Sequence, residues 1–77
     1  NCKSLRKVVI ENGVIHISNN AFRGCENLTD IYLPSSIGYI GENAFRECYD
    51  IKIHCYANSL PYIYAKDQGL NIEILTE

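Results

Sequence analysis

The sequence contains no long apolar run and no excess of basic residues, and each absence excludes a class of protein. No stretch approaches the roughly eighteen consecutive apolar residues that a membrane-spanning helix needs, and no basic stretch followed by an apolar one resembles a signal peptide. The chain has 7 Lys and Arg against 9 Asp and Glu, so it lacks the positive charge that phosphate backbones attract. We therefore expect no membrane insertion by this segment and no nucleic-acid partner.

The motifs of common enzymes and metal sites are also missing. The chain has no Gly-rich phosphate loop, no paired-carboxylate motif and no G-x-S-x-G sequence. It has 4 Cys and 2 His, but no C-x-x-C pair of the kind that chelates zinc. Neither His16 nor His54 aligns with a Cys in the way a thiol nucleophile requires, so each is interpreted as an ordinary exposed side chain. We expect a protein that is not an enzyme and that binds no metal and no cofactor.

What the sequence does contain is a 23-residue repeat. The segment N-N-A-F-R-G-C at 19–25 returns as E-N-A-F-R-E-C at 42–48. When residues 2–24 (the first copy) are laid over residues 25–47 (the second copy), seven positions are identical, where chance would give roughly one or two. The identical pairs are Cys2/Cys25, Leu5/Leu28, Ile17/Ile40, Asn20/Asn43, Ala21/Ala44, Phe22/Phe45 and Arg23/Arg46. A fixed period of this length predicts stacked repeats that bury their apolar sides against their neighbours.

Each copy predicts a strand, a turn and a second short extended segment. Residues 28–33 and their mates 5–10 have the alternation of a strand with one buried face. Turn signals follow at residues 12–13 and 34–36. The N-A-F-R pieces at 20–23 and 43–46 predict single helical turns, with Phe22 and Phe45 as inward anchors. We expect Leu5 over Leu28, Val8 over Ile31 and Phe22 over Phe45.

The C-terminal third has a different pattern. Residues 51–55 alternate as a strand, and residues 70–74 do so again. Between them, Ser59 is a helix N-cap, Pro61 suits the first helical turn and Gly69 suits the end. Leu60, Ile63 and Tyr64 fall on one face of this helix. A helix and a strand can cover the last repeat of a stack.

These motifs resemble a known family. The run L-x-x-I-x-L-P-x-x-I-x-x-I-G-x-x-A-F-x-x-C at residues 28–48 is similar to the BspA-like leucine-rich repeats, a 23-residue class common in surface and secreted proteins of bacteria and some protozoa. The first copy departs from it at residues 11–13, where E-N-G replaces a Pro-containing turn. The resemblance covers residues 2–53 and implies a parallel-stranded solenoid at the cell surface or secreted.

We therefore predict an α/β fold, a short leucine-rich-repeat solenoid with parallel strands, short helical turns and a C-terminal helix-strand cap. Residues 1–77 would form a single domain, with repeats at about 2–24 and 25–47, a partial repeat at 48–55 and a cap at 56–77. The chain starts at a repeat boundary, so it is interpreted as the C-terminal end of a longer array. An open edge at residues 1–20 is expected to cause self-association.

The cysteines repeat with the same phase. Cys2, Cys25 and Cys48 follow one another at the repeat period, which predicts an inward ladder of small apolar side chains. Strand neighbours are about 4.8 Å apart, so parallel Cβ atoms would stay beyond the preferred disulfide distance of about 3.8 Å. We expect reduced thiols. Cys55 and His54 would point to opposite faces of one strand.

A candidate ligand-binding strip follows from the same alternation. The residues expected to point outward from the predicted sheet are Lys7, Val9, Glu11, Asp30, Tyr32, Lys52 and His54. Tyr is enriched at protein interfaces, and it also contacts carbohydrates. The competing interpretation is a solvated sheet face on which Tyr32 only supports strand formation.

Three functions are compatible with the sequence. The leading one is a non-catalytic module that binds a protein or glycan partner, within an adhesin-like surface or secreted protein. The second is a structural spacer or end-cap of a larger protein. The third, a small thiol or hydrolytic enzyme, would need a cleft that brings His and Cys together. Asn27 and Thr29 form an N-glycosylation sequon that matters only on a eukaryotic secretory route.

Overall fold

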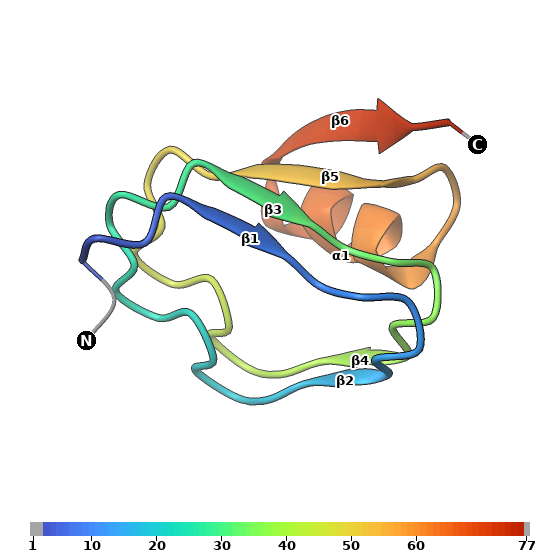
Figure 1. Ribbon diagram of the computed structural model, residues 1–77, viewed down its shortest axis with the longest axis horizontal. Coiled ribbons are helices and arrows are strands. Elements are labelled where there is room, and N and C mark those ends of the chain that lie inside the picture. The colour runs from blue at the N-terminus through green and yellow to red at the C-terminus, as the bar shows by residue number, and fades with distance from the viewer. Residues whose placement is uncertain (1–2, 77) are drawn as a thin grey trace.

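A computed structural model describes residues 3–76 as two parallel sheets and one helix (Figure 1). The larger sheet has the order β1 (Lys7–Val9), β3 (Asp30–Tyr32), β5 (Lys52–Tyr56) and β6 (Asn71–Leu75). The smaller sheet pairs β2 (His16–Ile17) with β4 (Tyr39–Ile40). Helix α1 (Leu60–Gln68) connects β5 to β6. Parallel strands joined in this way give the mixed strand and helix arrangement that the sequence predicts.

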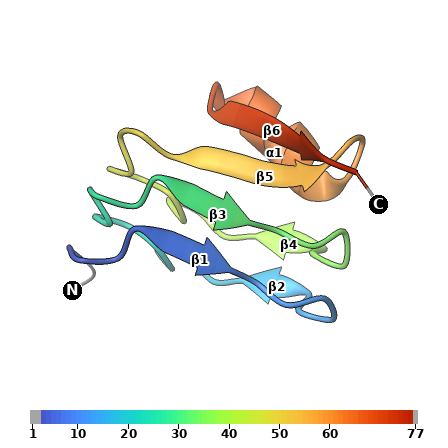
Figure 2. The same cartoon turned by 45° about the horizontal axis from the view of Figure 1, so that its top comes forward.

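The sequence copies lie over one another in register, and Figure 2 shows β1, β3 and β5 side by side. Val8 pairs with Ile31, its mate in the next copy, as predicted. The rings of Phe22 and Phe45 stack with centroids 5.6 Å apart, so this predicted pair is also confirmed. Ile31 pairs with Ile53, which lies one position short of the repeat period. One residue is thus missing from the third pass of the chain, which explains why the sequence match fades after residue 51.

The core lies between the two sheets and is best covered in the second copy. Leu28, Ile31 and Leu33 have at most 1% of their surface exposed. Their counterparts in the first copy, including Val8, are only partly buried. The difference arises because, among the described residues, the second copy has a neighbour on each side and the first copy has a neighbour on one side only.

The predicted helical turns are wrong. Residues 19–24 and 42–47 form consecutive turns instead. Ala21 N donates to Ser18 O and Ala44 N donates to Gly41 O, which are bonds that a helical turn could also begin with. Asn20 has a φ of 61° and Asn43 a φ of 59°, however, and left-handed residues cannot continue a right-handed helix.

The cap helix has the predicted ends. Ser59 Oγ accepts from Tyr62 N, Pro61 lies in the first turn, and Gly69 ends the helix with a φ of 73°. The buried side chains are Pro61 and Ala65, whereas Ile63 is 60% exposed. Of the three residues expected to share one helical face, Leu60 and Ile63 are exposed, whereas Tyr64 is partly buried and packs against the core.

The cysteines do not all remain thiols. Cys48 and Cys55 are buried and free, and burial raises the pKa of both. Cys25 is disulfide-bonded, so the expectation of reduced thiols is wrong at this position. Cys25 lies next to turns and not within a strand, so the argument from parallel strand Cβ atoms does not apply to it. Cys2 lies outside the described residues.

Candidate interaction surface

Six of the seven predicted strip residues lie on the outer face of the larger sheet, in two cross-strand rows. One row consists of Lys7, Asp30 and Lys52, and the other of Val9, Tyr32 and His54. Glu11 is exposed but lies beyond the end of β1. Strand β6 extends the rows with Asn71 and Glu73, which the sequence does not predict. The alternation of residues 70–74 was visible, but the spacing from Lys52 to Asn71 is shorter than the repeat period and follows no internal copy.

The centre of this face is a stack of three side chains. The rings of Tyr32 and His54 lie nearly parallel, at 11°, with centroids 4.0 Å apart. Lys7 Nζ lies 5.3 Å from the centroid of the Tyr32 ring. Since β1 and β5 flank β3 on opposite sides, Lys7 and His54 approach Tyr32 from opposite sides. Tyr32 therefore presents mainly its ring edge and hydroxyl to solvent.

His54 points outward as predicted, but it is not an exposed side chain. It is only 7% exposed because the Tyr32 ring covers it and Asp30 binds it. His54 Nε2 lies 2.8 Å from Asp30 Oδ1, and Thr29 Oγ1 donates to Asp30 Oδ2 at 3.0 Å. The hydrogen bonds from His54 and then from Thr29 lower the pKa of Asp30, so its carboxylate accepts and His54 Nε2–H donates at neutral pH.

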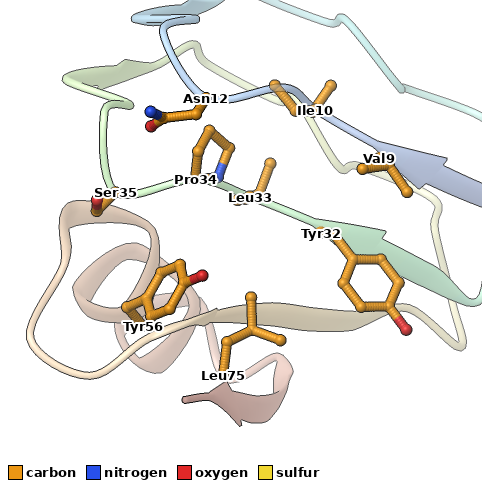
Figure 3. Close-up of a pocket in the computed structure, with 9 residues that line it drawn as sticks. All are labelled: Val9, Ile10, Asn12, Tyr32, Leu33, Pro34, Ser35, Tyr56 and Leu75. Atoms are coloured by element: carbon orange, nitrogen blue, oxygen red, sulfur yellow. The ribbon is translucent and has the colours of Figure 1, made fainter. Parts of the chain in front are cut away.

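A shallow hollow adjoins this stack at the carboxyl ends of the strands (Figure 3). It encloses about 470 Å³. Its lining residues are Val9, Ile10, Asn12, Tyr32, Leu33, Pro34, Ser35, Tyr56 and Leu75. Val9 is 62% exposed, which is high for a branched aliphatic side chain. Tyr56 and Leu75 come from the cap, where there is no repeat phase, so the sequence does not predict their place on this surface.

Comparison with known proteins agrees with this arrangement. A family model described as the BspA type leucine rich repeat region (6 copies) matches residues 1–66. The chain belongs to this family. No curated protein and no solved structure matches it. Leucine-rich repeats of the BspA type are generally non-enzymatic, and in this family they are commonly associated with the cell surface.

Other ionisable groups of the BspA-type chain are dispersed. His16 packs edge-on against Tyr39 in the smaller sheet, with ring centroids 4.8 Å apart. Cys55 is buried in the core, on the opposite side of β5 from His54. Within residues 3–76, His, Cys, Asp and Glu side chains form no group of three that could hold a metal ion. In the same range, no helix has the length and apolar character needed to cross a membrane.

The Asp30 and His54 pair predicts a pH dependence of stability in the BspA-type chain. The folded carboxyl has a lowered pKa, so it binds its proton less tightly than the unfolded chain does. Its stabilising contribution is present above about pH 4 and is lost as the pH falls further, through the folded pKa. We expect Asp30→Asn to flatten the loss of stability on acidification, measured by urea unfolding between neutral pH and acid.

A matched control for this experiment is Asp50→Asn. Asp50 is exposed and makes no hydrogen bond or ion pair within residues 3–76. This variant should show the pH profile of the unchanged chain. An unchanged profile in Asp30→Asn would contradict the coupling between Asp30 and His54.

Proposed function

We propose that this chain is a non-catalytic protein-interaction module, part of a leucine-rich-repeat solenoid in an adhesin-like surface or secreted protein. Family membership supports an interaction role. The observation that carries the proposal is the outer face of the larger sheet, where exposed Val9 and the edge of Tyr32 adjoin an open hollow. An apolar and aromatic centre with a charged surround is typical of protein interfaces.

A protein partner is better supported than a glycan. A sugar ring binds an aromatic side chain across an uncovered ring face, and both sides of the Tyr32 ring are approached by other side chains. The surrounding charges have both signs. Lys52 Nζ lies 3.6 Å from Glu73 Oε1, and both side chains are about half exposed, so this pair contributes little to stability and can exchange partners.

The test compares two variants with similar exposure in different places. The chain is first screened against an array of surface proteins and a glycan array. We expect Val9→Asp to weaken binding to any protein hit at least about tenfold, because a charge would be desolvated at the interface centre. Ile15→Asp, at a position that is 64% exposed and outside the larger sheet, should leave binding unchanged.

The alternative function is a structural spacer. The ion pairs within the outer face, Lys52 with Glu73 and Asp30 with His54, also suit a surface that is only solvated. A spacer would bind nothing on either array. Protein binding that Val9→Asp leaves intact would likewise contradict the outer face as the binding surface, and glycan hits would change the class of partner.

We also propose self-association through the first copy. β1 has an unpaired edge among the described residues, and Val14 is 39% exposed where its counterpart Ile37 is 2% exposed. Exposed strand edges recruit other strands. Sedimentation velocity at several concentrations should show a rising mean mass, and a constant monomer mass would refute the proposal.

A further inference from the structure

The turns of the first and second copies share one backbone conformation. Asn20 and Asn43 have φ values of 61° and 59°, and Gly24 and Glu47 have φ values of 79° and 68°. Backbone dihedrals determine where each N–H group points. The amides of the second turn therefore point in the same direction, relative to their own copy, as those of the first.

In the first turn, three alternate amides bind the second copy. Asn20 N donates to Glu42 O at 2.9 Å, Phe22 N to Ala44 O at 2.8 Å, and Gly24 N to Arg46 O at 2.9 Å. Asn20 corresponds to Asn43 in the second copy, and its acceptor Glu42 lies one position earlier. The other two bonds follow the same rule. These bonds hold the turn of one copy against the turn of the next.

In the second turn, the equivalent amides have no such acceptors. Asn43, Phe45 and Glu47 donate no backbone hydrogen bond within residues 3–76. The described part of the chain forms no third turn of this kind, because it continues from Cys48 into β5 and then into α1. A row of three alternate N–H donors is left at the end of the stack, although backbone donors are normally paired.

This row borders a groove of about 450 Å³ between the second turn and the C-terminal half of α1. The apolar lining residues are Ile40, Phe45, Tyr64 and Leu70, and the others are Gly41, Glu42, Asn43, Arg46 and Gln68. The rings of Phe45 and Tyr64 lie 6.0 Å apart, and burial raises the pKa of Tyr64. Glu42 and Arg46 carry opposite charges, so the groove does not favour a ligand of either sign.

We propose that this groove binds a short peptide segment of a partner protein in the turn conformation of residues 42–46, so that its alternate carbonyl groups accept hydrogen bonds from Asn43, Phe45 and Glu47. The chain itself shows the geometry, since residues 42–46 present alternate carbonyls to the first turn. Main-chain hydrogen bonds to unpaired backbone groups are a common source of affinity in peptide recognition.

A second copy of the chain does not fit this groove. A whole repeat stacked on the second copy would need the space next to β3, which β5 already occupies. It would also need the place of the next Phe in the column of Phe22 and Phe45, where Tyr64 lies. The occupant is therefore a short segment with a small residue opposite Phe45.

These requirements define a probe peptide. Residues 41–47 read G-E-N-A-F-R-E, so the probe is the blocked heptapeptide G-E-N-A-A-R-E, in which Ala replaces the Phe that Tyr64 would exclude. We titrate the full 77-residue chain, labelled with nitrogen-15, and follow its amide resonances. We expect saturable shifts at Asn43, Phe45 and Glu47, and binding at least about threefold weaker for G-E-N-A-F-R-E.

Two tryptophan variants test whether the probe peptide binds in the groove. Gln68→Trp should fill the groove and weaken probe binding at least about tenfold, whereas Asp67→Trp, at the preceding position and outside the groove lining, should leave it unchanged. The amide spectrum of each variant reports whether it remains folded. Val9→Asp should also leave probe binding unchanged, which separates this test from that of the outer face.

Two results of the titration would overturn the proposal. One is the absence of saturable shifts at the three amides. The other is a set of shifts confined to Asn19, Ala21 and Arg23, which would place the peptide at the carbonyl edge of the first turn. Equal binding by Gln68→Trp and Asp67→Trp would likewise exclude the groove.

Discussion

Replacing Gly41 by alanine is expected to lower the free energy of unfolding by about 3 kcal/mol. A Cβ atom on Gly41 would lie 2.6 Å from Asn19 Cα and 2.5 Å from the Ser18 carbonyl carbon. These are backbone atoms of the first copy, so no flexible side chain can move aside. The hydrogen bond from Gly41 N to Ile17 O, 2.7 Å long, holds the two copies at this separation.

The matched control is Gly38→Ala, slightly earlier in the same copy. Its Cβ would lie 3.5 Å from Ile15 Cγ2, an ordinary contact. We expect a change within about 0.5 kcal/mol. Urea unfolding followed by circular dichroism measures both variants, and equal effects would contradict the close approach of the copies at Gly41.

The second large effect is expected for Phe45→Ala, which should destabilise the chain by about 3–5 kcal/mol. Phe45 is 5% exposed and lies between the rings of Phe22 and Tyr64. A cavity there would remove contacts to both neighbours at once. Because small domains have only about 5–15 kcal/mol of stability, this variant could be largely unfolded.

The control is Phe22→Ala, the same substitution at the equivalent position of the first copy. Phe22 is only half-buried and stacks on Phe45 alone among the aromatic rings of the described residues. We expect roughly half the effect of Phe45→Ala. Phe45→Leu keeps the comparison measurable if the alanine variant does not fold. Equal losses for Phe22→Ala and Phe45→Ala would show that the first copy is as well covered as the second.

The sequence predicted the stacking of the copies because repeat phase and strand alternation are local patterns. Val8 over Ile31 follows directly from a shift by one repeat period, and the ends of α1 follow from the local chemistry of Ser59 and Gly69. The sequence predicts a helical turn at Asn43, whereas the structure has a non-helical turn there, because one positive φ value changes the path of the chain and Asn occurs in both conformations.

The candidate surface is predicted less completely, because part of it comes from segments that do not follow the repeat period. Tyr32 and Lys7 repeat the alternation of their strands, so their common face was readable. The burial of His54 depends on a strand spacing one position shorter than the repeat period, which brings it beside Tyr32 and Asp30. Tyr56 and Leu75 join the hollow from the cap, where the sequence has no internal copy to compare.

The hydrogen bonds between the copies bear on which part of the molecule unfolds first. Ser36 Oγ accepts from Gly13 N at 3.0 Å and donates to Val14 O at 2.7 Å, and Thr29 Oγ1 donates to Arg6 O at 3.2 Å. In each bond a side chain of the second copy holds backbone of the first. Detachment of the first copy leaves these hydroxyls to water and leaves β3 paired with β5. Within the described residues, we therefore expect the first copy to open before the cap, so a partner bound to the first copy would also limit local unfolding.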